Sequence, residues 1–270
     1  MSFLPAVPVG GYAGWAVLKR TVTAQQAAYD KQPRIQRDEA YFRANISKVK
    51  SADDLVKDRR LLGIALGAFG LEADIDNKFF IRKVLEDGTL KPEALAMRLA
   101  DKRYREFSVA IGLGDFGTSR IRMSDFADTI IRQWKQRQFE GAVGQVDDSL
   151  RLAMNAEREI AKIASSSMSE DARWFTLMGQ RPLRQVLETA FGLPKSFGTL
   201  DLDQQKQVLK QRAKTAFGDE GVAQFARSDR MQALIKQYLL RNQAANNLGA
   251  NPGGAALTLV SQMAASMRRS

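Results

Sequence analysis

The stretch Arg60-Leu61-Leu62-Gly63-Ile64-Ala65-Leu66-Gly67-Ala68-Phe69-Gly70-Leu71 decides the fold class. It is apolar on most of a helical circumference, as expected of a helix buried on nearly every side. Gly70 is placed to end this helix, because glycine adopts the left-handed conformation without a Cβ clash. Leu71 is then expected to pack back against Leu66 on the last turn. We therefore predict a buried helix that stops at a glycine.

A second stretch ends in the same way. Leu187-Glu188-Thr189-Ala190-Phe191-Gly192-Leu193 again places Phe-Gly-Leu at a helix end, and Pro194 follows it. Asp74-Ile75-Asp76-Asn77 also matches Asp201-Leu202-Asp203-Gln204, at a spacing of 127 residues. We interpret these matches as an internal duplication of one helical unit. Its expected structural anchors are the two Phe-Gly-Leu endings, namely Phe69, Gly70 and Leu71 in the first unit and Phe191, Gly192 and Leu193 in the second.

Composition restricts the chemistry that this chain can perform. Its 270 residues, 44% of them hydrophobic, are enough for one large or two smaller globular domains. It has no cysteine and no histidine, which excludes disulfides, cysteine-zinc sites, thiol catalysis and every nucleophile activated by a histidine base. We expect a non-enzymatic protein and nominate no catalytic, cofactor-binding or metal-ligating residue and no cofactor. A carboxylate-based hydrolase or small-ligand domain is the third alternative.

The net charge of +11 is compatible with a nucleic-acid or membrane-surface partner. The basic residues, however, are spread among acids along expected helix faces, and no run of five or more occurs. This distribution is typical of a solvated basic surface. Nucleic acid is therefore an unlikely partner by this reading, and protein partners are expected instead.

Two features in the middle of the chain need interpretation. Gly112-Leu113-Gly114-Asp115-Phe116-Gly117 matches G-x-G-x-x-G by letter, but a helix precedes it and no βαβ pattern surrounds it. We expect a glycine-rich hinge there. From Ser124 to Ala164 no proline occurs and apolar residues recur at helical spacing. The pattern predicts one long helix, with Gly141 and Gly144 as the places where it would bend or break.

The two ends have compositions of their own. Residues 1–15 are apolar but interrupted by proline and glycine, so we expect them to contribute no core helix. They are interpreted either as an extended arm on the protein's own surface or as a docking or export segment. The tail 244–270 is rich in Ala, Asn and Gly and is expected to be flexible. The candidates for partner binding are apolar residues of these two ends, Phe3, Leu4, Leu257 and Val260.

Together these patterns predict an all-α protein with two related helical units joined by a long helix, and flexible termini. We expect Tyr41-Phe42 and Trp174-Phe175 to be the corresponding aromatic pairs that open the units. A capping box of Ser51 and Asp54 is expected to start the helix that holds the first unit's buried stretch. The expected divisions are an N-terminal arm 1–20, a first unit 21–122, a connecting helix 123–164, a second unit 165–243 and a tail 244–270. No segment is apolar and long enough to suggest a transmembrane span.

Several motifs also resemble a known family. They are PVGGYAGW at 8–15, RQFEGAVG at 137–144, LAMNA at 152–156, WFTLMG at 174–179 and FGTLDLD at 197–203. As a set, they are similar to a bacterial family of unknown function whose members are often encoded among flagellar genes. The similarity extends from residue 8 to about 242, and the tail lies outside it.

This resemblance implies an all-α fold without an established active site, so it transfers no catalytic residue. It implies an accessory or structural role in flagellar assembly or motility through protein–protein contacts. The protein would then be cytoplasmic, or associated with the flagellum if exported. The alternative is a basic cytoplasmic protein that binds nucleic acid or acidic partners. The identity of the partner and the oligomeric state are not encoded in any pattern of the sequence.

Overall fold

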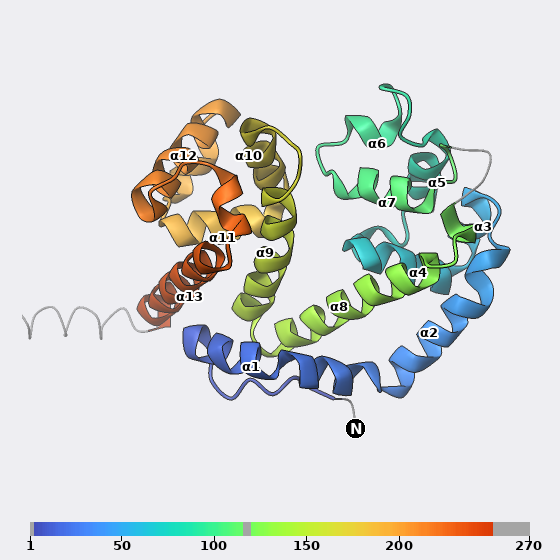
Figure 1. Cartoon of the computed structure of the whole chain (residues 1–270), viewed down its shortest axis with the longest axis horizontal. Coiled ribbons are helices and arrows are strands. Elements are labelled where there is room, and N and C mark those ends of the chain that lie inside the picture. The colour runs from blue at the N-terminus through green and yellow to red at the C-terminus, as the bar shows by residue number, and fades with distance from the viewer. Residues whose placement is uncertain (1–2, 116–119, 251–270) are drawn as a thin grey trace, which may run out of the picture. The chain divides into compact units, whose positions relative to one another are not determined.

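The computed structural model describes residues 3–115 and 120–250, with side chains described as far as residue 246. In these ranges every regular element is a helix, which confirms the all-α prediction (Figure 1). The α-helices and the short 3-10 helices (η) are α1 Gly11–Asp30, α2 Pro33–Asn45, η1 Ile46–Lys48, α3 Ala52–Lys57, α4 Arg59–Phe69, η2 Glu72–Asp74, α5 Lys78–Asp87, α6 Leu95–Arg98, α7 Arg103–Ile111, η3 Arg120–Arg122, α8 Phe126–Val146, α9 Asp148–Ala164, α10 Glu170–Gly179, α11 Arg181–Phe191, η4 Lys195–Thr199, α12 Leu202–Phe217, η5 Val222–Ala226 and α13 Ser228–Ala250.

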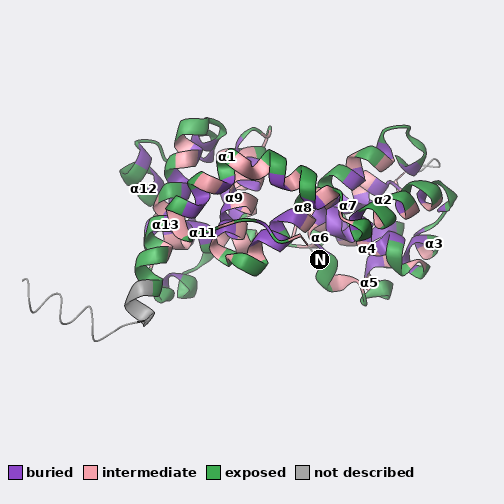
Figure 2. Ribbon diagram, turned by 90° about the horizontal axis from the view of Figure 1, so that it is seen from below, coloured by how far each residue is buried: buried purple, intermediate pink, exposed green. Residues whose placement is uncertain are grey.

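The chain forms two compact units. Unit 1 comprises Met1–Pro8 and Ala16–Arg151, and unit 2 comprises Val9–Trp15 and Leu152–Ser270. The division therefore lies at Arg151, inside α9, rather than at residue 165. Within each unit the buried residues lie on the helix faces that pack together, and exposed residues face outward (Figure 2).

Both predicted helix stops are confirmed. Gly70 ends α4 in the left-handed conformation (φ 70°, ψ 35°), and the Leu71 backbone N–H donates to the Leu66 carbonyl at 3.0 Å. Gly192 ends α11 in the same way (φ 61°, ψ 43°), with Leu193 donating to Glu188 at 2.9 Å. These are Schellman endings, in which the chain reverses and satisfies the last carbonyls of the helix. The predicted capping box is also present, but it starts the short helix α3, and the buried stretch lies in the next helix, α4, which Asp58 caps separately.

The predicted long helix is two helices. The break falls at Asp147, whose extended backbone ends α8 and whose Oδ1 accepts the N–H groups of Ser149 (2.8 Å) and Leu150 (3.3 Å) at the start of α9. Gly141 and Gly144 both remain inside α8. The prediction of one helix was wrong because the Asp147 side chain caps α9, which offsets the cost of the backbone hydrogen bonds lost where α8 ends. The apolar periodicity continues across the break and does not reveal it.

The N-terminal expectation also needs correction. α1 begins at Gly11, and Trp15 is only 2% exposed, so the segment 1–15 does contribute to a core helix. Glycine at the start of a helix imposes no steric conflict, and the apolar residues that follow are enough to bury one face. Pro33 begins α2 at its first turn, where a missing N–H costs nothing.

The glycine-rich segment is a packed turn where it is described. Gly112 ends α7 with φ 69°, and a Cβ on Gly114 would lie 2.6 Å from the Glu86 carbonyl oxygen. The Asp115 carboxylate accepts two hydrogen bonds from Thr89, one from its backbone N–H and one from its hydroxyl group at 2.8 Å. The turn is therefore fastened to the end of α5 rather than free to act as a hinge. Residues 116–119 lie outside the described part.

The two units share an order of elements after each Phe-Gly-Leu stop. η2, α5, α6 and α7 follow α4, and η4, α12, η5 and α13 follow α11. At the predicted spacing of 127 residues, Phe107 and Ile111 correspond to Leu234 and Tyr238, and all four are fully buried. The aromatic pairs do not correspond in this order, because Tyr41-Phe42 lies two helices before α4 and Trp174-Phe175 lies in the helix directly before α11. Duplication therefore stays a prediction.

Candidate functional site

The Phe-Gly-Leu corner of unit 1 is held by two arginines. Arg137 Nε donates to the Ala68 carbonyl at 2.9 Å, and Arg103 donates to the carbonyl of Gly70. These guanidinium groups lie against the negative end of the α4 dipole, which is a stabilising position for a cation. Arg103 is itself paired with Asp101 (Nη2 to Oδ2, 2.6 Å). The arginines are thus used in holding the corner together.

A tyrosine at the same corner is kept protonated. Tyr104 donates its hydroxyl proton to Asp74 Oδ2 at 2.5 Å, and its ring meets Phe80 edge-on. Burial, together with this hydrogen bond and the neighbouring Asp74 charge, raises the pKa of Tyr104 far above that of a free phenol. Such a phenol acts as a fixed hydrogen-bond donor at neutral pH, which is a structural role.

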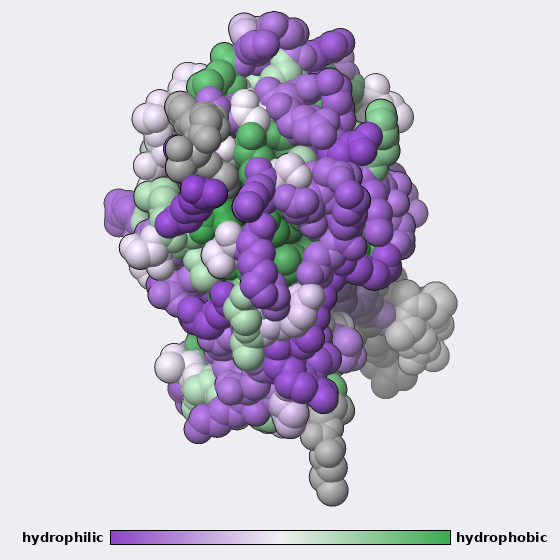
Figure 3. Space-filling model, turned by 90° about the vertical axis from the view of Figure 1, so that its right-hand side faces the viewer, coloured by the Kyte–Doolittle hydropathy of each residue, from purple (hydrophilic) through white to green (hydrophobic). Residues whose placement is uncertain are grey.

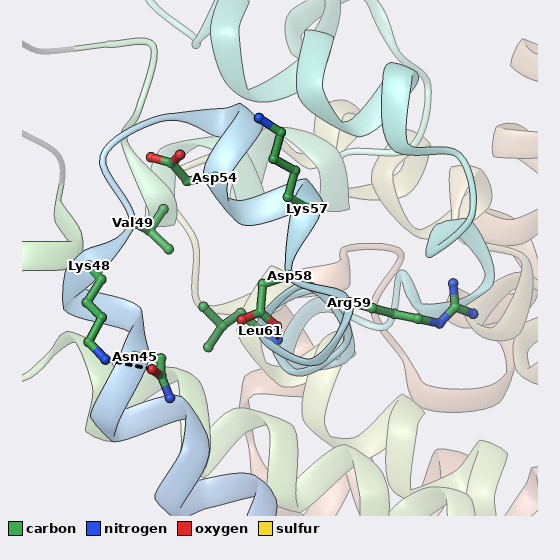
Figure 4. A pocket seen from close by; sticks show the side chains of 8 residues that line it. All are labelled: Asn45, Lys48, Val49, Asp54, Lys57, Asp58, Arg59 and Leu61. Carbon is green, nitrogen blue, oxygen red and sulfur yellow. Dashed lines mark hydrogen bonds between the residues drawn. The ribbon is translucent and has the colours of Figure 1, made fainter.

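An open hollow of about 600 Å³ lies between the end of α2, η1, α3 and the start of α4 (Figure 4). Its polar side chains serve to hold helix ends. Lys48 Nζ donates to Asn45 Oδ1 at 2.8 Å, Asp54 completes the capping box of α3, and Asp58 accepts the N–H groups of Arg60 and Leu61 at the start of α4. This hollow is a corner of the fold whose charged groups are already committed.

A smaller hollow on unit 1 has a different character. Its volume is about 230 Å³, and it lies between α3 and the first turns of α5. Phe79, beside the hollow, is 73% exposed, whereas the adjacent Phe80 is half-buried. The lining combines apolar surface with three cations and one acid, Asp53, Val56, Lys57, Lys78, Phe79 and Arg82.

Unit 2 exposes apolar side chains at the start of α12. Leu202 is 59% exposed and Leu200 is 36% exposed, and they alternate with Asp201 and Asp203. Asp201 Oδ1 accepts the Gln204 N–H at 2.8 Å and so caps α12. Single exposed apolar side chains are common on protein surfaces, so the feature that distinguishes this corner is the pair of leucines together with the two flanking aspartates.

The predicted repeat anchors are buried, but their aromatic partners differ. Phe69 (7% exposed) meets Phe107 of α7 edge-on at 5.6 Å between ring centroids. Phe191 (3% exposed) meets Phe217 of α12 at 6.2 Å. Each phenylalanine therefore contacts a helix of its own unit. The two helices do not correspond, because α7 is the third α-helix after α4 and α12 is the first after α11.

The two N-terminal candidates for partner binding, Phe3 and Leu4, differ in whether they contact the rest of the chain. Phe3 packs edge-on against Tyr29 at 6.3 Å, and the Ala6 backbone exchanges two hydrogen bonds with the Gln25 side chain (2.7 and 3.1 Å). The arm therefore lies on its own unit, as the first of the two interpretations had it. Leu4 is 59% exposed. Leu257 and Val260 lie outside the described residues.

Sequence reasoning missed Phe79 and Leu202. The sequence held no signal for the exposure of Phe79, because two adjacent helical residues can both be buried, as Val84 and Leu85 are. For Leu202 the available signal was its position between two aspartates. Elsewhere in the described part, no three His, Cys, Asp or Glu side chains converge as a metal ion would require. Nor does any described helix have the length and apolarity needed to cross a bilayer.

Comparison with known proteins agrees with this architecture. The model of the family described as "Protein of unknown function (DUF1217)" matches residues 68–231. The chain belongs to this family. The crystal structure of protein AGR_C_984 from Agrobacterium tumefaciens is similar with a TM-score of 0.74, covering 90% of this chain and 100% of that chain at 24% sequence identity. At that identity the similarity establishes a shared fold only. The comparison with curated proteins found no match.

Proposed function

We propose that this member of the DUF1217 family is a non-enzymatic protein that works through protein–protein contacts, as an accessory or structural component in flagellar assembly or motility. The observation that supports contact formation is the pair of exposed, charge-flanked apolar surfaces around Phe79 and around Leu202. The support for the flagellar setting is the resemblance of the sequence motifs to a family often encoded among flagellar genes.

The alternative is a basic protein that binds nucleic acid or acidic partners, and the net charge of +11 favours it. Many of the cations, however, are engaged in ion pairs with acids of the same unit, such as Arg60 with Asp38 (2.8 Å) and Lys210 with Glu220 (3.2 Å). A paired cation offers less to a phosphate backbone than a free one. Protein contact is therefore the first proposal.

The test is recovery of partners from native cells together with a swimming assay. The intact tagged protein should recover flagellar components, identified by mass, and a deletion strain should swim poorly until the intact gene is returned. A second strain carrying the chain without residues 251–270 tests the C-terminal candidates Leu257 and Val260, and we expect it to fail to restore swimming. Normal swimming of the deletion strain, with no flagellar component recovered, would contradict the flagellar role.

A further inference from the structure

The small hollow on unit 1 is an apolar site whose rim carries three cations and one acid, and we call it the basic hollow (Asp53, Val56, Lys57, Lys78, Phe79 and Arg82). Val56 is 5% exposed and forms its buried apolar part, while Phe79 protrudes beside it with the Arg82 guanidinium 5.3 Å from its ring centroid. Figure 3, seen from the side on which α3 and α5 lie, shows apolar residues grouped within a mostly hydrophilic surface. The hollow can accept a branched aliphatic side chain beside Phe79.

The rim of the basic hollow carries surplus positive charge. Lys57 pairs with Asp53, and Arg82 lies 3.7 Å from the same carboxylate and 3.7 Å from that of Glu86. Lys78 has no ion pair within residues 3–115 and 120–250. Two acids, Asp53 and Glu86, thus face three cations, and an occupant that adds a carboxylate beside its apolar side chain would complement the cation that remains, Lys78.

The start of α12 in unit 2 has the opposite character, and we call it the acidic corner (Leu200, Asp201, Leu202 and Asp203). Leu202 is 59% exposed, and the neighbouring Asp203 side chain is 79% exposed and pairs with Lys206 at 3.0 Å. This corner therefore presents an aliphatic side chain between two carboxylates.

We propose that the acidic corner of one molecule docks into the basic hollow of a second copy, with Leu202 inserted beside Phe79 and Asp203 facing Lys78. The inference rests on the proposed function, since it names one partner for the same contact surfaces. Each molecule carries both surfaces. Two contacts can therefore close a two-fold dimer, or successive contacts can extend a chain.

Electrostatics set the conditions for this association. Two molecules of charge +11 repel each other at long range, but at about 0.15 M salt the Debye length is about 8 Å, so that repulsion is largely screened. Carboxylate–ammonium pairs that form at contact are screened less, because they are partly removed from solvent. Association is therefore expected at physiological salt rather than in dilute buffer.

The test uses sedimentation of the full chain over a concentration series at physiological salt. The unaltered chain should associate, and Phe79→Gln or Leu202→Gln should each weaken association at least about tenfold. The control substitutions Leu90→Gln and Leu240→Gln remove apolar side chains that are similarly exposed (64% and 47%) outside the two surfaces, and they should change nothing. A monomer at every concentration, or equal effects of test and control variants, overturns the inference.

A charge exchange provides the second, independent measurement. Lys78→Glu and Asp203→Lys should each weaken association, and a chain carrying both should recover it, because the pair is restored with its signs reversed. Helicity and Tm of each variant report whether it is folded. Failure of the double variant to recover overturns the inference. If the full chain is monomeric but still recovers flagellar components from cells, the proposed function is supported and the contact with a second copy is wrong.

Discussion

Gly70 and Gly192 each carry two constraints, one from the backbone and one from a neighbouring arginine. Both have positive φ, which costs an L-residue about 1–2 kcal/mol. At Gly70 a Cβ would lie 2.7 Å from Arg137 Nη1, and Arg137 is bonded to the end of α4. At Gly192 the Cβ position is taken by the guanidinium of Arg241, which is exposed and free to move away.

We therefore predict that Gly70→Ala lowers the free energy of unfolding more than Gly192→Ala does, and that both cost at least about 1 kcal/mol. Urea denaturation measures the difference. Gly218→Ala is a control for the backbone cost alone, since Gly218 has φ 84° with nothing within 4 Å of a Cβ. Gly141→Ala, in an open position inside α8, should stabilise by about 0.5–1 kcal/mol. Equal costs at Gly70 and Gly192 would contradict the role given to Arg137.

The two anchor phenylalanines should be equally important to their units. Phe69→Ala and Phe191→Ala each remove a buried ring from an aromatic contact, and we expect each to cost roughly 3–5 kcal/mol. Thermal or urea unfolding followed by circular dichroism provides the measurement. The exposed Phe79→Ala is the matched control and should cost well under 1 kcal/mol. A small effect at either anchor would mean that its unit does not depend on that corner.

The capping box of α3 makes stability depend on pH. Hydrogen bonds from the backbone of Lys50 and from Ser51 hold the pKa of Asp54 below the ordinary 3.8 of an aspartate. A carboxyl whose folded-state pKa is lowered adds stability above its unfolded pKa, and that contribution is lost as the pH falls through the folded-state value.

Asp54→Asn should therefore destabilise the protein at pH 7, and the difference from the unaltered chain should shrink as the pH falls below about 4. Urea midpoints at pH 7 and near pH 3 measure it. Ser51→Ala is the comparison, because its hydroxyl accepts from the Asp54 N–H, which does not titrate, and also helps to lower the pKa of Asp54. Part of its effect should therefore persist in acid. A constant difference for Asp54→Asn at both pH values would show that the carboxylate charge plays no part.

At the scale of elements, the sequence predicts those features that are local. The stops at Gly70 and Gly192 and the capping box at Ser51 each depend on a few adjacent residues, and all three are found where expected. The break at Asp147 was missed because the apolar spacing continues across it, so that only the side-chain cap reveals a new helix. Exposure of Phe79 and Leu202 was missed for a further reason, because it depends on which helices cover which faces.

The break at Asp147 supports a prediction about α9. Asp147→Ala removes the acceptor for the first N–H groups of α9 and should lower the free energy of unfolding by about 1 kcal/mol. The neighbouring Asp148→Ala removes only an exposed pair with Arg151 (2.7 Å) and should cost well under 1 kcal/mol. Equal costs would contradict the assignment of Asp147 as the cap. Urea unfolding of the two variants makes the comparison.

The charge of the whole molecule gives a prediction about nucleic acid. A protein that neutralises phosphates loses affinity for duplex DNA as salt rises. For each phosphate neutralised, log K falls by about 0.9 per tenfold increase in salt concentration. Because many cations here pair with acids of their own unit, we predict no sub-micromolar binding to random duplex or single-stranded DNA at physiological salt. Fluorescence anisotropy over a salt series measures it. Tight, salt-sensitive binding would make the nucleic-acid alternative the first proposal.

The N-terminal segment links the scale of the residue to that of the whole molecule. The sequence pattern predicts that residues 1–15 contribute no core helix, and a chain of residues 16–243 would on that basis fold with nearly unchanged helicity and Tm. Trp15, however, is 2% exposed and its Nε1 donates to Gln232 at 3.3 Å, while Ala6 is held by Gln25. The two halves of this segment therefore differ in what their removal should cost.

Deletion of residues 1–8 removes the arm but leaves α1 intact, and we expect a modest fall in Tm. Deletion of residues 1–15 also removes the first turn of α1 with Trp15, and we expect a further loss of at least the roughly 3–5 kcal/mol that truncation of a buried tryptophan costs. Trp15→Ala in the full chain should account for most of that further loss. If both deletions melt at the same temperature as the intact chain, the segment is dispensable to the fold, and its apolar residues are again candidates for binding a partner.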